Sequence, residues 1–317
     1  MGAGQTRVHR IDPCEARRNL LPVYELAALG AAISWAATGL MVTPPLTRLG
    51  PFAFNFYRQG FTALVLALIV GLGGSWHGST WAQVLPLILS GFVGIFLGDT
   101  VLFTSIARIG PRRAGALFAL NAPIAAVLGW AVLDEALSPM AWLGVLLCAA
   151  GVGLAVLGRP GRSGGHAFEA VRGSLSMGIG LGVAAALAQA VGSLIARPVM
   201  EQGFDPFTGS MIRVATAAVG LSVLMALPIP ALKPKGRLDM RLFLLLAGSG
   251  ILAMVIGMSL LLFALQGGKV GIVSTLSALS PVFILPGLWI VTGARPSATS
   301  WAGAAIAVIG MGLIFLR

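Results

Sequence analysis

Residues 114–158 read AGALFALNAPIAAVLGWAVLDEALSPMAWLGVLLCAAGVGLAVLG, and this stretch sets the pattern for the rest of the chain. It holds two apolar segments, each long enough to cross a bilayer, joined by a short hairpin that carries Asp134 and Glu135. Its second segment contains the pattern W-x-G-x6-G-x-G from Trp142, which recurs near the end of the chain from Trp301. We expect the glycines of this pattern to pack two helices closely together.

The front of the chain repeats in the same way. The pattern P-F-x5-R begins at Pro51 and again at Pro206, so that Arg58 corresponds to Arg213. Self-similarity over a long period is the signature of a duplicated unit. The sequence therefore predicts two copies of a unit of about 155 to about 159 residues.

The composition indicates a membrane protein. Hydrophobic residues make up 57% of the 317 residues and charged residues only 10%, against roughly 25% charged in an ordinary soluble domain. A backbone in lipid must satisfy its own hydrogen bonds, so each apolar run is expected to be a helix. The ten runs cover residues 24–43, 53–72, 82–105, 114–132, 139–157, 174–196, 207–228, 242–265, 270–291 and 299–316.

Five spans in each copy place the second copy in the membrane in the opposite direction to the first. The predicted fold is thus an all-α membrane protein with ten transmembrane helices, arranged as two inverted five-helix repeats. The predicted parts are a polar N-terminal tail (1–22), a first repeat (23–158), a basic linker loop (159–173) and a second repeat (174–317).

Several classes of function are disfavoured. The net charge of +11 comes mainly from short loops between apolar spans, which indicates topology signals and no nucleic-acid partner. Cys14 and Cys148 are too few for a disulfide framework, and we expect no metal site and no cofactor. The three histidines lie far apart, outside the spans, so no catalytic residues are predicted and the chain is not expected to be an enzyme.

A charged pair is predicted inside the membrane. Asn55, Arg58, Gln59 and Thr62 share one face of the second span, and Asp99 lies at similar depth in the third. An arginine at this depth needs a partner, and Asp99 is the obvious one. Two hypotheses stay open at this point: a structural ion pair, or a carboxyl that takes up a proton during transport.

The second copy keeps the arginine but lacks the carboxylate. The positions that match Asp99 are Gly257 and Met258, so Arg213 has no equivalent partner. We expect Arg213 to extend toward the membrane interface, as long basic side chains near helix ends do. The alternative is that its charge contacts an anionic group of a ligand.

Polar and aromatic residues recur at one depth in the first span of each copy. Ser34, Trp35 and Thr38 lie in the first span, and Gln189 and Ser193 lie at the corresponding depth in the sixth. Two interpretations are open: these residues line a substrate site near the midplane between the two repeats, with Asn55 as a further contact, or they bond to neighbouring helices inside the membrane.

Prolines at matching positions extend this predicted site. Pro123 follows Asn121, and Pro281 follows Ser277. A proline removes a backbone donor and frees a carbonyl that neighbouring polar groups can bond. Asn121 and Ser277 are therefore further candidates for substrate contacts.

Residues 97–158 carry a resemblance to a known family. The GDT at residues 98–100, the A-x-x-G-x-R-R at residues 107–113, Pro123, the acidic hairpin and the glycine-rich helix together resemble the EamA family of the drug/metabolite transporter superfamily. The repeat extends the similarity over nearly all of the chain that follows the N-terminal tail. The resemblance implies a ten-helix, two-repeat carrier that moves small metabolites, often by export and without ATP.

One feature of that family is present in only one copy. Glu135 matches the glutamate that the family keeps after its fourth helix, whereas residues 291–297 read VTGARPS and contain no acid. We interpret Glu135 as a capping or loop residue at the membrane interface.

The predicted function is a secondary transporter of small metabolites, amino-acid-like or other small organic solutes, which exports them by alternating access. The polar and aromatic candidates favour a largely uncharged or zwitterionic solute. The alternatives are proton-coupled efflux of drugs or cations, a passive channel, and a membrane-embedded enzyme. The predicted partners are the lipid bilayer, the solute and, if Asp99 is titrated, protons; a homodimer stays open.

The predicted location is the cell membrane, which in a bacterium is the inner membrane, with multiple passes. More basic residues follow the odd-numbered spans than the even-numbered ones, which predicts that both termini face outside. The arginines of the N-terminal tail, Arg7, Arg10, Arg17 and Arg18, favour the opposite orientation.

Overall fold

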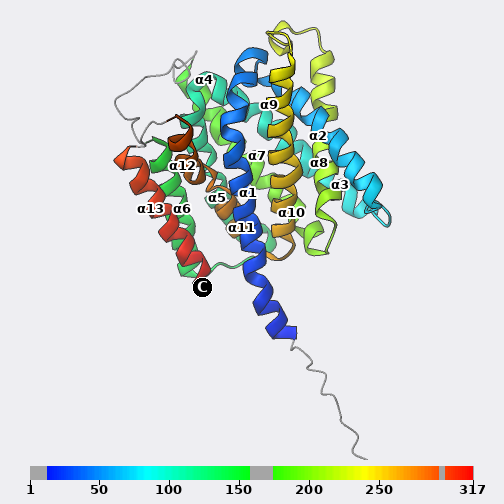
Figure 1. The fold of residues 1–317 in the computed structure, drawn as a ribbon. Coiled ribbons are helices and arrows are strands. Elements are labelled where there is room, and N and C mark those ends of the chain that lie inside the picture. The colour runs from blue at the N-terminus through cyan, green and yellow to red at the C-terminus, as the bar shows by residue number, and fades with distance from the viewer. Residues whose placement is uncertain (1–12, 158–173, 293–296, 317) are drawn as a thin grey trace, which may run out of the picture.

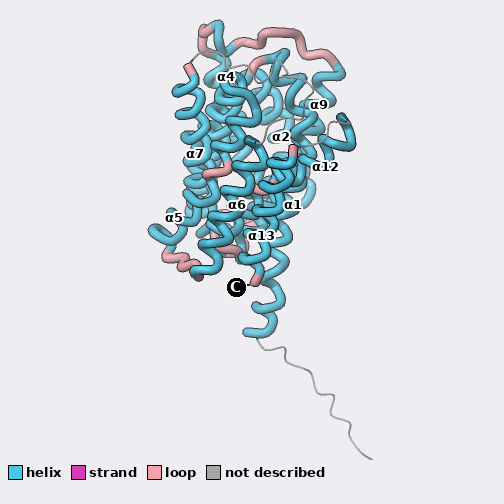
Figure 2. The backbone as a smooth tube through the Cα atoms, turned by 90° about the vertical axis from the view of Figure 1, so that its left-hand side faces the viewer, coloured by secondary structure: helices cyan, strands magenta, loops and turns pink. Residues whose placement is uncertain are grey.

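Helices dominate the computed structural model, which describes residues 13–157, 174–292 and 297–316, and no strand occurs in these ranges. Loops lie mainly at the two ends of the helix bundle (Figure 2). The first half contains α1 (Pro13–Leu49), α2 (Pro51–Gly73), α3 (Trp81–Gly91), η1 (Phe92–Leu97), α4 (Gly98–Phe118), α5 (Asn121–Leu133) and α6 (Pro139–Leu157). The second half contains α7 (Leu175–Glu201), α8 (Pro206–Ala226), η3 (Pro230–Leu232), α9 (Met240–Gly250), η4 (Ile251–Gly257), α10 (Met258–Gly267), α11 (Val270–Ser277), α12 (Ser280–Thr292) and α13 (Ala298–Phe315).

The ten predicted apolar runs fall on single helices, on helices that contain a π-helical segment, or on two helices joined by a turn. Eight helical segments of the described chain are long and apolar enough to cross a membrane, and Val270–Pro286 is apolar but shorter. The prediction of an all-helical, multi-pass membrane protein is therefore confirmed. α1 begins at Pro13, inside the stretch predicted as a polar tail, and residues 1–12 and 158–173 lie outside the described residues.

Two features interrupt the long helices. Gly110 has φ 84°, which turns the chain sharply at the basic loop between the third and fourth spans, and glycine adopts this backbone readily. The π-helical segments η1 and η4 interrupt the third helix of each copy, and they begin at equivalent positions, Phe92 and Ile251, in the register that matches Trp142 with Trp301. Such segments often mark functional sites.

The two halves of the chain interleave. α1 packs against η4 and against the helices α9, α10, α11 and α12 of the second half. α7, its counterpart, packs against η1 and against α3, α4 and α5 of the first half. In Figure 1 α1 crosses the front of the bundle beside α9, α10 and α11. The first helix of each copy is thus a part of the other copy's core.

α6 and α13 pack side by side at the edge of the bundle, as the repeated glycine pattern predicts (Figure 1). A Cβ on Gly144 would lie 2.7 Å from the carbonyl oxygen of Gly310, and one on Gly151 would lie 2.5 Å from the nitrogen of Ala307. Side chains at these positions would separate the helices. The last glycine of each pattern, Gly312 and its counterpart Gly153, has open space around it and takes no part in the contact.

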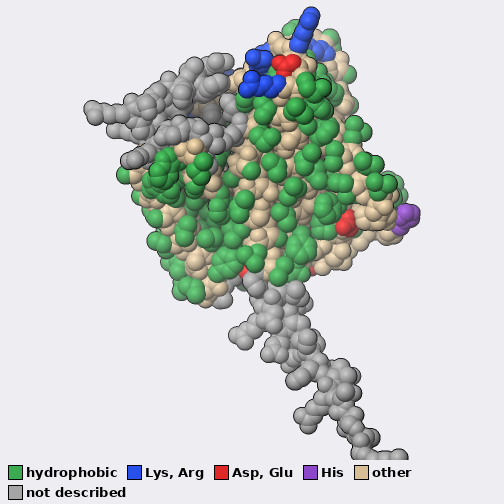
Figure 3. Space-filling view, viewed as in Figure 1, with side chains coloured by type: hydrophobic (Ala, Val, Ile, Leu, Met, Phe, Trp, Pro, Cys, Tyr) green, Lys and Arg blue, Asp and Glu red, His purple; other side chains and the backbone are tan. Residues whose placement is uncertain are grey.

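The surface supports a membrane location. Large apolar side chains cover the flank of the bundle in Figure 3, and many of them are strongly exposed. Leu68, Leu72, Trp130 and Ile290 are examples. Basic side chains gather at the upper end, where Arg48 pairs with Asp239 at 3.3 Å. The apolar flank suits lipid, and the charged end suits the aqueous boundary.

Candidate functional site

The charged pair of the first repeat lies at the centre of the candidate site. Arg58 of α2 donates from Nη2 to Asp99 Oδ2 at 2.7 Å, and the side chains are 4% and 16% exposed. Gln59 Nε2 donates to the same carboxylate oxygen at 3.1 Å. The predicted proximity of Arg58 and Asp99 is thus observed. A buried ion pair with an added hydrogen bond is costly to break, because either survivor would be an unpaired charge.

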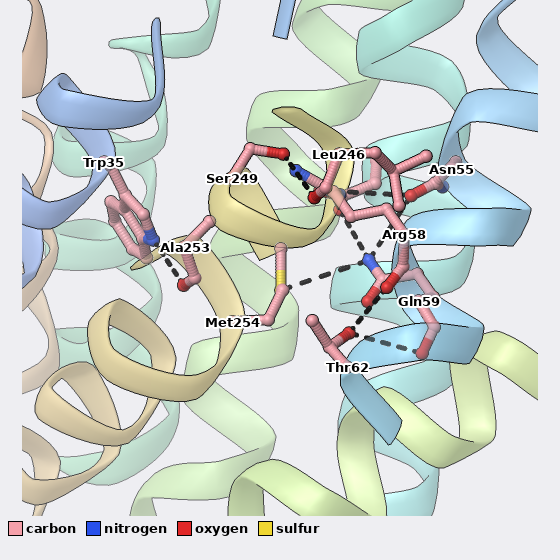
Figure 4. A network of polar contacts seen from close by, with 10 residues as sticks. Trp35, Asn55, Arg58, Gln59, Thr62, Leu246, Ser249, Ala253 and Met254 are labelled. Carbon is pink, nitrogen blue, oxygen red and sulfur yellow. Dashed lines mark hydrogen bonds and ion pairs between the residues drawn. The ribbon is translucent and has the colours of Figure 1, made fainter. Parts of the chain in front are cut away.

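Polar and aromatic groups complete the surroundings of Arg58. Asn55 Oδ1 lies 3.3 Å from Gln59 Nε2 and 3.5 Å from Arg58 Nη2, and Figure 4 shows these side chains converging beside the η4 segment. The guanidinium carbon is 5.3 Å from the ring centre of Phe54 and 4.9 Å from that of Phe103, which are cation–π distances. Neither ring was predicted from the sequence. The contact with Phe103 depends on how α2 and α4 pack, whereas Phe54 lies four residues before Arg58 on α2, a spacing that could have indicated it.

The second repeat reproduces this arrangement without the acid. Arg213 of α8 donates from Nη1 to the sulfur of Met258 at 3.1 Å. In the register that matches Trp142 with Trp301, Met258 is the equivalent of Asp99, so the thioether occupies the position that the carboxylate has in the first copy. Of the two matches that the sequence left open, Met258 and not Gly257 corresponds to Asp99.

The expectation that Arg213 extends to the membrane interface is wrong. Its side chain is fully buried, and its Nε and Nη2 atoms have no hydrogen-bond partner in the described part of the chain. The cause is packing by the other repeat. A Cβ on Gly91 would lie 2.6 Å from the Cα of Arg213, and one on Gly94 would lie 3.1 Å from its Nη2. The first repeat's third helix therefore covers Arg213 from the side.

A reciprocal contact relates the two repeats. Gly91 of α3 lies against Arg213 of α8, and Gly250 of α9, the equivalent of Gly91 in the second repeat, lies against Arg58 of α2. A Cβ on Gly250 would come within 3.4 Å of Arg58 Cγ. Each arginine thus sits where the second helix of one repeat meets the third helix of the other.

Trp35 joins α1 to the second repeat. Its Nε1 donates to the carbonyl oxygen of Ala253 at 2.9 Å, within η4 (Figure 4), and its ring lies beside Gly257. The buried Thr38 donates to its own helix at the carbonyl of Trp35, and Ser34 is half-buried. Trp35 therefore contacts the π-helical segment of the second repeat, whereas Thr38 bonds to the backbone of its own helix, α1.

The candidates on α7 lie beside the helix that carries Asp99. Ser193 is buried and Gln189 is half-buried. A Cβ on Gly98 would be 3.9 Å from the backbone nitrogen of Gln189. A Cβ on Gly192 would be 2.7 Å from the Cα of Gly94. The structure thus brings α7 to the level of Asp99.

The side chains of Asn121 and Ser277 form hydrogen bonds at two helix breaks, between α4 and α5 and between α11 and α12. Asn121 Nδ2 donates to the carbonyl of Phe118 at 2.7 Å, where α4 gives way to α5. Ser277 Oγ donates to the carbonyl of Ser274 at 3.1 Å, just before α12 begins. The bonded carbonyls belong to Phe118 and Ser274, and that of Ser274 also accepts from the backbone nitrogen of Ala278 at 3.0 Å. Neither is the carbonyl that lies four residues before Pro123 or Pro281, so these bonds are not the ones expected from the prolines. Both side chains are bonded to backbone in this arrangement.

The sequence profile of the EamA-like transporter family matches residues 23–157 and again residues 176–316. Together the matches cover most of the chain, and they fall on the two interleaved halves. The chain belongs to the EamA-like transporter family.

Two further comparisons agree with this family. The uncharacterized transporter YwfM of Bacillus subtilis (strain 168) is 25% identical over 292 residues, which are 91% of this chain and 92% of YwfM. A protein chain of known crystal structure, 21% identical, matches with a TM-score of 0.72 over 93% of this chain and 97% of its own length. The second similarity concerns the fold alone.

In this EamA-family chain, the glutamate of the acidic hairpin links the two repeats. Glu135 Oε1 accepts from Arg197 Nε at 3.0 Å, and its Oε2 accepts from the backbone nitrogen of Val270, the first residue of α11, at 2.6 Å. Lys269 donates to the carbonyl of Ala136 beside it. Glu135 is therefore a capping residue, as interpreted from the sequence, but the helix that it caps belongs to the other repeat.

Proposed function

We propose that this EamA-family chain is a secondary carrier that moves small organic solutes by alternating access, without ATP. It crosses the membrane ten times as two inverted repeats, with residues 23–158 and 174–317 as the repeats, 1–22 as the tail and 159–173 as the linker. The transport direction is export from the cytoplasm.

The reciprocal contact between the repeats is the observation that carries this proposal. Each repeat places its first helix in the core of the other, and each buries its arginine against a glycine of the other's third helix. Two equivalent interfaces of this kind can open in turn. The movement that opens one interface is related, by the symmetry of the repeats, to the movement that opens the other. Inverted repeats of this kind are the usual basis of alternating access.

The substrate site lies near the midplane, between the repeats. The polar side chains that support this are Ser34, Trp35, Thr38, Asn55, Asn121, Gln189, Ser193 and Ser277, with the charged Arg58, Asp99 and Arg213. Trp35 and Gln189 come from α1 and α7, and these two helices contact the π-helical segments of the opposite repeat. Small polar and aromatic groups suit a small solute that is largely uncharged or zwitterionic.

Asp99 is the candidate for coupling to protons. Its carboxylate is partly exposed, at 16%, and is bonded to Arg58 and Gln59 through one oxygen, Oδ2. A proton-coupled carrier of cations would need this carboxylate to leave Arg58. Flux that follows an imposed pH gradient, and that loses this response in Asp99→Asn protein recovered in a folded state, would support coupling.

Flux into liposomes tests the carrier. Purified full-length protein should move at least one member of a panel of amino acids, organic acids, aromatic amines and drug-like cations, with saturation and without ATP. Protein-free liposomes are the control for leakage. Flux that rises linearly with concentration for every solute moved would indicate a channel, and formation of a product would indicate an enzyme.

A further inference from the structure

The charges at the centre of the protein do not balance. Two buried guanidinium groups lie against the third span of the first repeat: Arg58 pairs with Asp99, whereas Arg213 lies beside Gly91 and Gly94. The hydrogen bonds of the Asp99 carboxylate go to Arg58 and Gln59. One positive charge is therefore in excess among these three groups, and it lies on Arg213.

Arg213 is a strong hydrogen-bond donor with a weak partner. Its side chain is 0% exposed, its Nη1 donates to the Met258 thioether, and its Nε and Nη2 have no partner in the described residues. A buried charge normally has an oppositely charged partner, because removing it from water is otherwise very unfavourable. Thioether sulfur is only a weak acceptor.

The first repeat shows what this kind of position binds. At Arg58 the partner is the carboxylate of Asp99, 2.7 Å from the guanidinium, and the corresponding place beside Arg213 belongs to Met258. A guanidinium presents its donors in a planar fork that fits a carboxylate. The first copy therefore indicates that the missing partner of Arg213 is a carboxylate.

We propose that Arg213 binds the carboxylate of the transported solute, which takes at Arg213 the place that Asp99 takes at Arg58. This inference rests on the proposed carrier function. Among small organic solutes it selects those that carry a carboxylate, which are zwitterionic amino acids and, beyond the uncharged or zwitterionic class given above, small organic acids. Arg213 is the specificity-determining residue for the acid group.

The packing around Arg213 couples this binding to the repeats. Its neighbours Gly91 and Gly94 belong to the third helix of the first repeat, whereas Arg213 and Met258 belong to the second. The guanidinium is fully covered in the described arrangement. A solute reaches it when α8 separates from α3 and η1, which is a movement of one repeat against the other.

The test compares acids with their uncharged amides. The unfolding temperature of purified full-length protein in detergent is measured with each amino acid or monocarboxylate of a panel and with the corresponding amide. Carboxylates should raise the unfolding temperature in a saturable manner, whereas amides should not. Equal shifts by acid and amide, or an equal shift by chloride alone, would overturn the proposal.

Two substitutions at Met258 sharpen the test. Met258→Asp places a carboxylate beside Arg213, so we expect a higher unfolding temperature without solute and an apparent affinity for carboxylates at least about tenfold weaker. Met258→Asn has the same shape as that variant without the charge and should keep the affinity within about threefold of wild type. Unchanged carboxylate affinity in Met258→Asp would contradict the proposal.

A second pair of variants covers the case in which Met258→Asp does not fold. Arg213→Met removes the excess charge and should accumulate at least as well as wild type, but without a carboxylate response. Arg58→Met leaves Asp99 unpaired and should accumulate poorly. Carboxylate binding that survives in Arg213→Met would refute the assignment.

Flux measurements separate this inference from the carrier itself. In liposomes the wild type should move acids in preference to their amides. Saturable flux of amides or cations without preference for acids would overturn the role of Arg213 and leave the carrier function standing. If no solute moves with saturation, the carrier function itself fails.

Discussion

Among single residues, the pair of Arg58 and Asp99 is expected to determine whether the protein folds. Changing Arg58→Met or Asp99→Asn leaves one buried group without its partner, which should destabilise the protein by about 3–5 kcal/mol. Protein level and unfolding temperature, measured by size-exclusion chromatography after heating, report this loss.

The double variant Arg58→Asp, Asp99→Arg is the control for that pair. It should recover much of the protein level, because the two charges again meet. Recovered protein without recovered transport would assign Asp99 a role in coupling beyond structure. Single variants that behave like wild type would contradict the importance of the pair.

Trp35 is expected to affect transport more than stability. Trp35→Phe removes the hydrogen bond to Ala253, which contributes about 0.5–1.5 kcal/mol, but retains most of the apolar surface. The apparent affinity for the solute should fall while the protein level stays near that of wild type. A loss of protein that parallels the loss of transport would mean that Trp35 only holds α1 on η4.

Individual residues also explain where prediction from the sequence failed. The pairing of Arg58 with Asp99 followed from depth and helical spacing, since both groups belong to one repeat. The burial of Arg213 did not, because the residues that cover it, Gly91 and Gly94, come from the other repeat. A glycine that faces a neighbouring helix looks the same in sequence as one that faces lipid.

Among the helices, the contact between α6 and α13 gives a prediction with a built-in control. Gly303→Ala places a Cβ against the backbone of Ala155 and should destabilise the protein by about 1–3 kcal/mol. Gly312→Ala, on the same helix, meets open space and should be neutral or stabilise by up to about 1 kcal/mol. Unfolding temperatures of the two variants check the difference, and equal effects would contradict the observed packing.

The helices themselves were largely predictable, whereas their irregularities were not. Uncharged runs and the repeat located most of the helices to within about five residues, because a segment in lipid has few alternatives to a helix. The exception is α1, which extends from Pro13 to Leu49, well beyond the predicted span 24–43. The π-helical segments η1 and η4 left no pattern that the sequence analysis recognised, and their equivalence is visible only once the segments are known. Fewer residues separate Arg58 from Arg213 than separate Trp142 from Trp301. The reason is that the loop between α8 and α9 is longer than its counterpart in the first copy.

For the molecule as a whole, the orientation in the membrane is a prediction of its own. The basic upper end is expected to face the cytoplasm, which places both termini outside. A reporter that is active only in the cytoplasm, fused after Arg317, should therefore be inactive. An active fusion would show that the arginines of the N-terminal tail determine the orientation.

Alternating access requires that the carrier exchange solute across the membrane. Counterflow measures this exchange: liposomes are loaded with an excess of unlabelled solute, and uptake of a trace of labelled solute is followed without ATP or a pH gradient. We expect a transient accumulation of label inside above its outside concentration, because each return of the site inward brings label in exchange for unlabelled solute. Uptake that never exceeds equilibrium and is unaffected by the internal solute would contradict alternating access.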